Sequence, residues 1–135
     1  NADSLCNSAK PSGTSQGYAF ASFSNTEEIV DLPNTQNINT NLNIKSSSGK
    51  LIAENWSDLL DGSIYMSFQS AGVALGGWWS FSNTDGSLQS SNCSGGTSTS
   101  GNGIIGSPTS ISNSWLLSNN RPCSNNYALI CIAKP

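Results

Sequence analysis

Apolar residues occur along the chain in short runs, and the spacing within two of these runs predicts short helices. The apolar residues of the segment 3–10 (D-S-L-C-N-S-A-K) are spaced so that a helix would place them on one face. The segment starts with Asp3, and Asp is a residue type that favours the N-cap position of a helix. Residues 54–64 (E-N-W-S-D-L-L-D-G-S-I) have the same kind of spacing, with Gly62 as a C-terminal stop. No longer helical pattern is present, so we expect helices to be a minor part of the fold.

Other runs have the alternation, or the content of β-branched and aromatic residues, that is typical of strands. These runs are residues 17–23, 76–81, 115–117 and 127–133, together with two short strands around a Ser-Gly turn in residues 44–52. In residues 76–81 (G-G-W-W-S-F), alternation places Trp78 and Trp79 on opposite faces of a sheet. Residues 34–43 are rich in Asn and Thr, which predicts a loop, and residues 82–114 are dominated by Ser, Gly, Asn and Thr, which predicts that nearly all of them are loop or very short strands.

The composition indicates one domain with a polar but weakly charged surface. A chain of 135 residues fits a single domain, residues 1–135. Charged residues make up only 10% of it, whereas 52 residues are Asn, Ser or Thr, so amides and hydroxyls must form most of the surface. The net charge of −3 argues against nucleic acid as a partner. No apolar run approaches the roughly 20 residues that a transmembrane helix needs.

The chain contains no histidine, which excludes Ser-His and Cys-His nucleophile pairs and histidine metal sites. We therefore expect a protein that is not an enzyme. The cysteines at positions 6, 93, 123 and 131 have no C-x-x-C spacing, and their even number in a loop-rich chain predicts two disulfides and an oxidising compartment. Four cysteines allow three pairings, and the spacing alone leaves all three open.

Several short motifs, taken in order, resemble those of a known fold. The closing C-S-N-N-Y-A-L-I-C-I has the C-x(7)-C spacing that ends C-type-lectin-like domains. An opening A-D-x-x-C helix, a G-Y-A-F-A-S-F strand, a W-x-x-L-x-x-G-S helix and a W-x-x-x-x-x-D-G strand and turn together resemble endostatin. The chain resembles still more closely the bacterial endostatin-like domains of leptospiral outer-membrane lipoproteins. The match covers nearly the whole chain and is weakest between residues 27 and 43.

This resemblance implies an α+β fold of the C-type-lectin-like (endostatin-like) class, with two short helices, a small twisted antiparallel sheet and long loops. It also implies two nested disulfides, Cys6 with Cys131 and Cys93 with Cys123, which bring the termini close together. The relatives are exported proteins of the outer membrane and cell surface, so we expect the same extracellular location here. A lipid anchor on a segment before Asn1 is one route of attachment.

The resemblance and the loop composition also define a candidate ligand-binding surface around residues 82–120. Loops on a disulfide-stapled frame are a frequent location for recognition. Trp79 matches the core tryptophan of the family, which leaves Trp78 as a candidate exposed aromatic anchor. The predicted ligand-binding residues are Trp78, Asn83, Asp85, Asn119, Asn120 and Arg121.

The metal sites of the related families are not expected in this chain. The calcium-binding W-N-D motif of sugar-binding C-type lectins corresponds here to Ser118, Asn119 and Asn120, and the E-P-N or Q-P-D tripeptide that accompanies it is missing. Endostatin uses histidines for zinc and an arginine-rich face for heparin, whereas this chain has no histidine and the single Arg121. We expect no metal and no other cofactor.

Three carboxylates give the one indication of an alternative chemistry. Glu54, Asp58 and Asp61 fall at positions i, i+4 and i+7, so a helix would align them as a glycosidase pair or a cation site requires. We prefer to interpret them as a solvated helix face, because no other group in the sequence converges on them.

Two functions lead, ahead of an enzyme such as a glycosidase at Asp58 and Asp61 and of a purely structural spacer that binds no ligand. The first is a non-enzymatic extracellular adhesion domain that recognises a host or neighbouring-cell macromolecule, such as a matrix or complement-type protein, through its long loop region. The second is a calcium-independent glycan-binding lectin domain, for example at the tip of a surface fibre. Family analogy supports the first, and the abundance of Asn and Ser beside tryptophan suits either.

Overall fold

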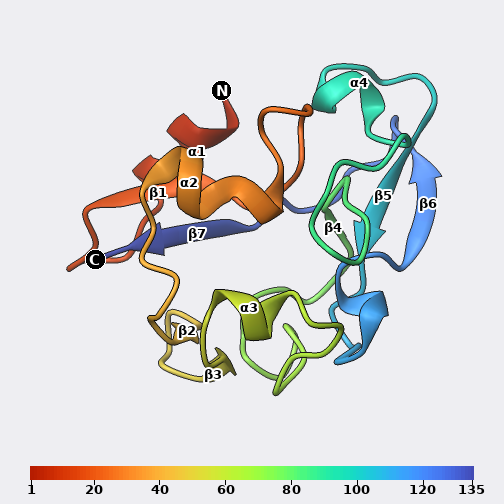
Figure 1. The fold of residues 1–135 in the computed structure, drawn as a ribbon. Helices are drawn as coiled ribbons and strands as arrows, with labels where there is room; N and C mark the ends of the chain where they lie inside the picture. Colours follow the sequence, from red (N-terminus) through yellow and green to blue (C-terminus); the bar gives the residue numbers. More distant parts are fainter.

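The computed structural model describes residues 1–135 and shows short helices and small antiparallel sheets joined by long turns (Figure 1). In chain order the elements, with η for a 3-10 helix, are α1 (Ala2–Ser8), β1 (Gln16–Ala19), η1 (Ile29–Asp31), α2 (Leu32–Gln36), β2 (Ile44–Lys45), β3 (Leu51–Ala53), α3 (Trp56–Leu59), β4 (Trp78–Trp79), α4 (Cys93–Gly96), β5 (Asn102–Gly106), η2 (Asn113–Trp115), β6 (Asn119–Pro122) and β7 (Cys131–Lys134). The α-helices number four, where the sequence predicted two. None of the helices is long and apolar enough to cross a membrane.

Helix α1 begins earlier than predicted because Asn1, and not Asp3, is its N-cap. The Asn1 side-chain oxygen accepts a hydrogen bond of 2.9 Å from a backbone N–H of the first turn. The Asp3 carboxylate instead accepts the backbone N–H of Ala19 at 2.8 Å, which attaches α1 to β1. Cys6 is buried whereas Leu5 is exposed, so the helix buries a narrower face than the sequence predicted.

The two ends of the chain meet in one small sheet. β1 and β7 pair antiparallel, with Tyr18 opposite Ile132. The Cys6–Cys131 disulfide joins α1 to β7, which confirms this predicted pairing. Both termini lie on the side of the molecule that contains this sheet, with the N-terminus at the top and the C-terminus at the left of Figure 1.

A three-stranded antiparallel sheet, in the order β4-β5-β6, forms the other side of the molecule. Its middle strand buries Ile104 and Ile105. The Cys93–Cys123 disulfide, also predicted, joins α4 to the end of β6. Residues 82–114, predicted to be nearly all loop or very short strands, contain the short strand β5 and also the helical turn α4, which was not predicted. The predicted strand at 115–117 is wrong, because η2 ends at Trp115 and the chain turns there.

Two further predictions need correction. Residues 34–36, predicted as loop, belong to α2, whose first turn contains a proline and buries Leu32. The helix predicted over residues 54–64 is shortened to α3, which begins after its N-cap Asn55, whose side-chain oxygen accepts the Asp58 backbone N–H at 2.8 Å, and ends at Leu59. The hairpin predicted within residues 44–52 is present as β2 and β3, which pair only with each other.

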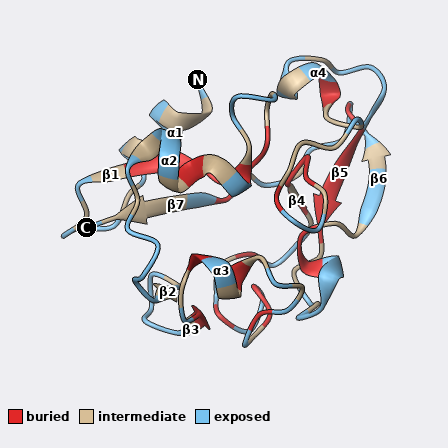
Figure 2. Ribbon diagram, viewed as in Figure 1, coloured by how far each residue is buried: buried red, intermediate tan, exposed pale blue.

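Aromatic residues dominate the main hydrophobic core. Phe20, Phe68, Trp78 and Trp115 are all buried and pack with ring centroids 5.4–6.1 Å apart. A smaller cluster surrounds the Cys93–Cys123 disulfide and includes Phe81. Figure 2 shows buried segments in β4, β5 and β3 and exposed residues along the turns.

Buried serines hold the turns against the core. The hydroxyls of Ser22 and Ser82 lie 2.7 Å apart, and Ser22 Oγ also accepts the backbone N–H of Ile29 at 3.0 Å. Ser80 Oγ donates to the Leu116 carbonyl at 2.6 Å. Because a buried hydroxyl is costly without partners, these bonds fix the chain around residues 80–88 relative to η1 and β4.

Candidate functional site

The structure buries Trp78, which the sequence assigned to the ligand-binding surface. Its side chain is 0% exposed and packs against Phe20 and Trp115. Trp79, assigned to the core, is only half-buried. The predicted role of Trp78 as an exposed anchor is therefore wrong, because its face of β4 meets the main aromatic core.

Asn83 and Asp85 belong to a tight turn over residues 83–87. Ser87 donates to Asp85 Oδ1 from its hydroxyl at 2.6 Å and from its backbone N–H at 2.9 Å, and these bonds hold the pKa of the Asp85 carboxyl below its usual range. Asn83 Nδ2 donates to Ser87 Oγ and to the Leu88 carbonyl. The Asn83 amide group therefore makes its hydrogen bonds within the turn, whereas the Asp85 side chain is exposed to solvent.

Asn119, Asn120 and Arg121 lie together on the outer strand β6. Asn119 is opposite Ile105 of β5, and the other edge of β6 has no strand partner. Both asparagines are exposed, and Arg121 is half-buried with Nη1 donating to the Asn120 carbonyl at 3.0 Å. The strand therefore presents two exposed amides and one guanidinium in a fixed register, and the Asn119 amide already donates from Nδ2 to Ser118 Oγ at 3.2 Å.

The predicted residues form two separate groups instead of one surface. The 83–87 turn is attached to η1 by the Val30 backbone N–H, which donates to the Gly86 carbonyl at 3.0 Å. β6 lies on the far side of β5 from β4, and no hydrogen bond joins it to the turn. Of the six predicted residues, Asn119, Asn120 and Arg121 share one strand, on which the side chains of Asn119 and Arg121 point to one face of the sheet and that of Asn120 to the other.

The three carboxylates do not form a helical stripe. Glu54 precedes α3 and Asp61 follows it, while the Asp58 carboxylate accepts the Glu54 backbone N–H at 2.8 Å. All three influence the hydroxyl of Tyr65. Loss of water around that hydroxyl, its hydrogen bond to Glu54 and the three negative charges raise the pKa of Tyr65. No group of three or more His, Cys, Asp and Glu side chains is arranged to hold a metal ion.

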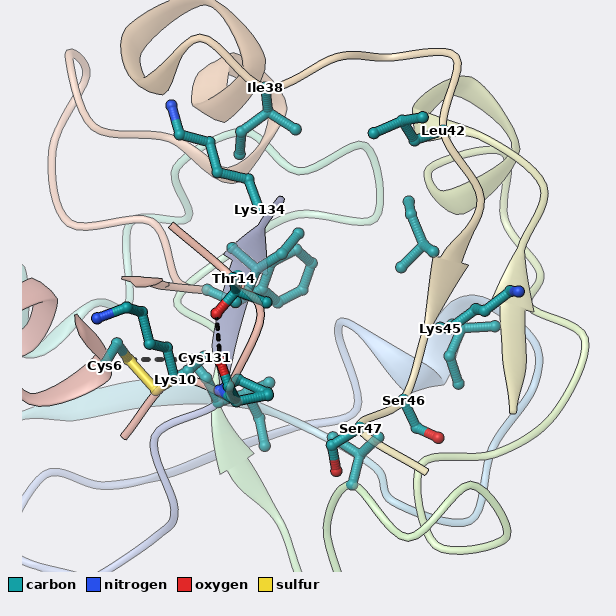
Figure 3. Close-up of a pocket in the computed structure, with 18 of the residues that line it drawn as sticks. Cys6, Lys10, Thr14, Ile38, Leu42, Lys45, Ser46, Ser47, Cys131 and Lys134 are labelled. Carbon is teal, nitrogen blue, oxygen red and sulfur yellow. Dashed lines mark hydrogen bonds between the residues drawn. A yellow bond between two sulfur atoms is a disulfide. The ribbon is translucent and has the colours of Figure 1, made fainter. Parts of the chain in front are cut away.

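A cavity of about 870 Å³ lies between the sheet formed by β1 and β7 and the hairpin formed by β2 and β3 (Figure 3). One wall consists of residues 129–135 and another of residues 42–47. Core side chains line the interior, namely Phe20, Ile52, Trp56, Leu59, Phe68 and Val73. The volume is within the range of ligand-binding pockets, and the lining is mainly apolar.

The charged residues that line this cavity are all lysines. Lys10, Lys45 and Lys134 line it, three of the five basic residues in the chain, and none of the eight Asp and Glu residues does. Lys134 Nζ donates to the Gln36 carbonyl at 2.6 Å. Figure 3 shows the three ammonium groups at the margins, directed away from the centre. The cavity thus has an apolar interior and a basic rim.

This cavity has no local sequence signature, because its walls come from segments far apart in the chain. One wall contains Ile38, Leu42 and Ile44, three apolar residues in a stretch of Asn and Thr. That sparse apolar pattern is the signal that marks the wall. It matches neither a helix nor a strand, and only the tertiary arrangement places it opposite β7.

No protein-family model matches the chain, and no curated protein matches it.

Proposed function

We propose that the chain is a non-enzymatic extracellular domain of the C-type-lectin-like (endostatin-like) class that binds a host or neighbouring-cell macromolecule through β6. The observation that carries the proposal is the exposure of Asn119 and Asn120 on an outer strand whose second edge has no partner. Amide side chains beside a free strand edge offer both donors and acceptors to a protein partner. Arg121, beside them, adds a cation that can meet a carboxylate of the partner.

A disulfide and a backbone hydrogen bond next to β6 lower the conformational entropy cost of binding a partner there. The Cys93–Cys123 disulfide fixes the end of the strand, and the Cys123 backbone N–H donates to the Gly101 carbonyl at 2.9 Å. A surface that is already ordered loses little conformational freedom when a partner binds. Polar side chains on such a frame therefore suit recognition of an extracellular protein.

The two disulfides support a location in an oxidising compartment. They are also the pairs that the endostatin-like resemblance implied, which supports carrying over the relatives' place at the bacterial surface as part of the proposal. Lipid anchoring belongs to the same proposal.

The test is a binding screen against immobilised matrix proteins, plasminogen and complement regulators. We expect one of them to bind, and we expect the triple variant Asn119→Ala, Asn120→Ala, Arg121→Ala to lose about tenfold or more in affinity. The control is Asp58→Ala with Asp61→Ala, which should leave affinity unchanged. If the control variant loses binding while the β6 variant keeps it, the proposal is wrong and a site at the carboxylates replaces it.

The alternative function, calcium-independent glycan binding, has a different aromatic platform from the one predicted. Trp78 is buried, but Trp79 and Tyr127 are half-buried, with ring centroids 5.0 Å apart. A partly exposed indole can stack on a sugar ring. A glycan array read with and without chelator tests this alternative, and loss of a signal in Trp79→Ala but not in the β6 variant would favour it.

A further inference from the structure

Two strands that face the same cavity each have an unpaired edge. β7 pairs only with β1, and β2 pairs only with β3. The first pair belongs to the sheet at the chain ends and the second to a separate hairpin, with the cavity between them (Figure 3). Unpaired strand edges carry backbone donors and acceptors that can pair with another chain.

The hydrogen bonds of β1 show which backbone groups of β7 are free. The N–H groups of Gly17 and Ala19 donate to side chains of α1, at 3.1 and 2.8 Å, and so point away from β7. Gly17 is opposite Ala133, and Ala19 is opposite Cys131. Because the bonding direction alternates along an antiparallel pair, the backbone groups of Cys131 and Ala133 point away from β1.

The lining of the cavity shows that this free edge faces inward. Every residue from 129 to 135 and every residue from 42 to 47 lines the cavity. A strand that showed only one face to a cavity would contribute alternate residues. Because all four residues of β7 line the cavity, the edge of β7, with its backbone N–H and C=O groups, borders the cavity, and the two-residue strand β2 and its flanking turns form the opposite wall.

We propose that this cavity accepts an extended segment of another polypeptide, which pairs as a strand along β7 and extends towards β2. The segment has apolar side chains at alternate positions, which enter the interior lined by Phe20, Phe68 and Val73. Its backbone pairs with Cys131 and Ala133. This site is independent of β6, which lies on the opposite side of the molecule in Figure 1.

The charge of the rim determines the chemistry of the segment. Lys10, Lys45 and Lys134 border the cavity, and no Asp or Glu side chain is among the lining residues. Acidic residues at the ends of the incoming segment would meet these lysines, while a basic segment would be repelled. The partner segment is therefore acidic at its ends and alternately apolar between them.

A polypeptide fits this cavity better than a fatty acid. An alkyl chain would also fill the apolar interior, and its carboxylate would meet a lysine. It would, however, cover the backbone groups of Cys131 and Ala133 without offering them hydrogen bonds, and a buried backbone group without a partner is costly. A strand satisfies both groups.

The probe is the synthetic peptide E-T-V-T-I-T-V-E, with binding measured by calorimetry and amide hydrogen exchange followed by NMR. We expect saturable binding with slowed exchange at the backbone amides of Cys131 and Ala133. The same peptide with lysines at its ends, or with prolines in place of its threonines, should bind about tenfold or more weakly, because it loses charge attraction or strand pairing.

Two variants and one control locate the site. Ala133→Pro removes a donor from the free edge while leaving the pairing with β1, and Leu42→Glu places a carboxylate on a half-exposed wall residue. Both should weaken peptide binding by about tenfold. Leu75→Glu, the same change at an exposed residue outside the cavity, should not.

The proposal fails if the peptide does not bind or if the proline peptide binds equally well. It also fails if decanoate protects the cavity residues while the peptide does not, since the cavity is then a lipid site. The β6 triple variant should bind the peptide normally, so that failure of this proposal and failure of the β6 proposal are distinguished.

Discussion

Trp78 and Trp79 are consecutive residues of β4, yet their side chains belong to two different hydrophobic clusters. Trp78 is fully buried and stacks 6.1 Å from Trp115 in the main core. Trp79 stacks 5.3 Å from Phe81, beside the Cys93–Cys123 disulfide. Because successive side chains of a strand point to opposite faces, one dipeptide connects both cores.

This arrangement predicts unequal effects of removing the two rings. Trp78→Ala should lower the free energy of unfolding by about 3–5 kcal/mol, the usual cost of deleting a fully buried aromatic side chain. Trp79→Ala should cost less, because that ring is half-exposed. Urea denaturation followed by circular dichroism measures both. A larger loss for Trp79→Ala than for Trp78→Ala would contradict the burial seen here.

The same pair shows what the sequence could and could not predict. Alternation correctly places the two rings on opposite faces, because it is a local property of any strand. Which face meets the core depends on Phe20, Phe68 and Trp115, which come from distant segments. No pattern among the residues near Trp78 indicates which of these distant segments pack against it. The assignment of Trp78 to the surface was therefore wrong.

The other predictions follow the same rule: they succeeded where neighbouring residues determine the structure and failed where tertiary packing determines it. The hairpin around the Ser-Gly turn was predicted because turn residues act locally. Helix α2 was not, since Asn and Thr are weak helix formers and burial of Leu32 stabilises it instead. The two disulfide pairs required the family resemblance, and the cavity required the three-dimensional arrangement of β7 and β2. The β6 residues and Asp85 were predicted to share one surface, whereas the structure places them in separate parts of the molecule.

Gly106 provides a second test of the packing around Trp78. A Cβ atom on Gly106 would collide with the Trp115 carbonyl and with the indole ring of Trp78. Gly106→Ala should therefore lower the free energy of unfolding by about 1–3 kcal/mol, as overpacking of a tight core does. The matched control is Gly76→Ala, where a Cβ would meet nothing within 4 Å. Equal melting temperatures for the two variants would show that β4 and β5 are not packed this closely.

The two disulfides should differ in their contribution to stability. Cys93–Cys123 spans 30 residues and Cys6–Cys131 spans 125. The loop-entropy relation gives about 3.6 kcal/mol for the shorter loop and about 4.9 kcal/mol for the longer one. Paired Cys→Ala variants, compared by guanidinium denaturation, should therefore show the larger loss for Cys6 and Cys131. A larger loss for Cys93 and Cys123 would mean that packing in the smaller cluster outweighs loop closure.

The Asp85 turn predicts a pH-dependent part of the stability. The Ser87 hydroxyl and backbone N–H hold the pKa of Asp85 below its usual range in the folded protein. A carboxyl whose pKa is lowered by folding stabilises the protein fully above its unfolded pKa, and this stabilisation is lost as the pH falls through the folded pKa. The loss therefore begins below about pH 4, the ordinary value for Asp.

Thermal unfolding of the wild type, Asp85→Asn and Ser87→Ala between about pH 7 and pH 2.5 measures this contribution. At neutral pH both variants should melt below the wild type, because each weakens the bonds to the charged carboxylate. The difference for Asp85→Asn should shrink as the pH falls, since protonation removes the same charge from the wild type. In Ser87→Ala the pKa of Asp85 should rise towards its ordinary value, because the hydroxyl is its strongest partner. A constant difference between wild type and Asp85→Asn across this range would show that the carboxylate charge does not stabilise the turn.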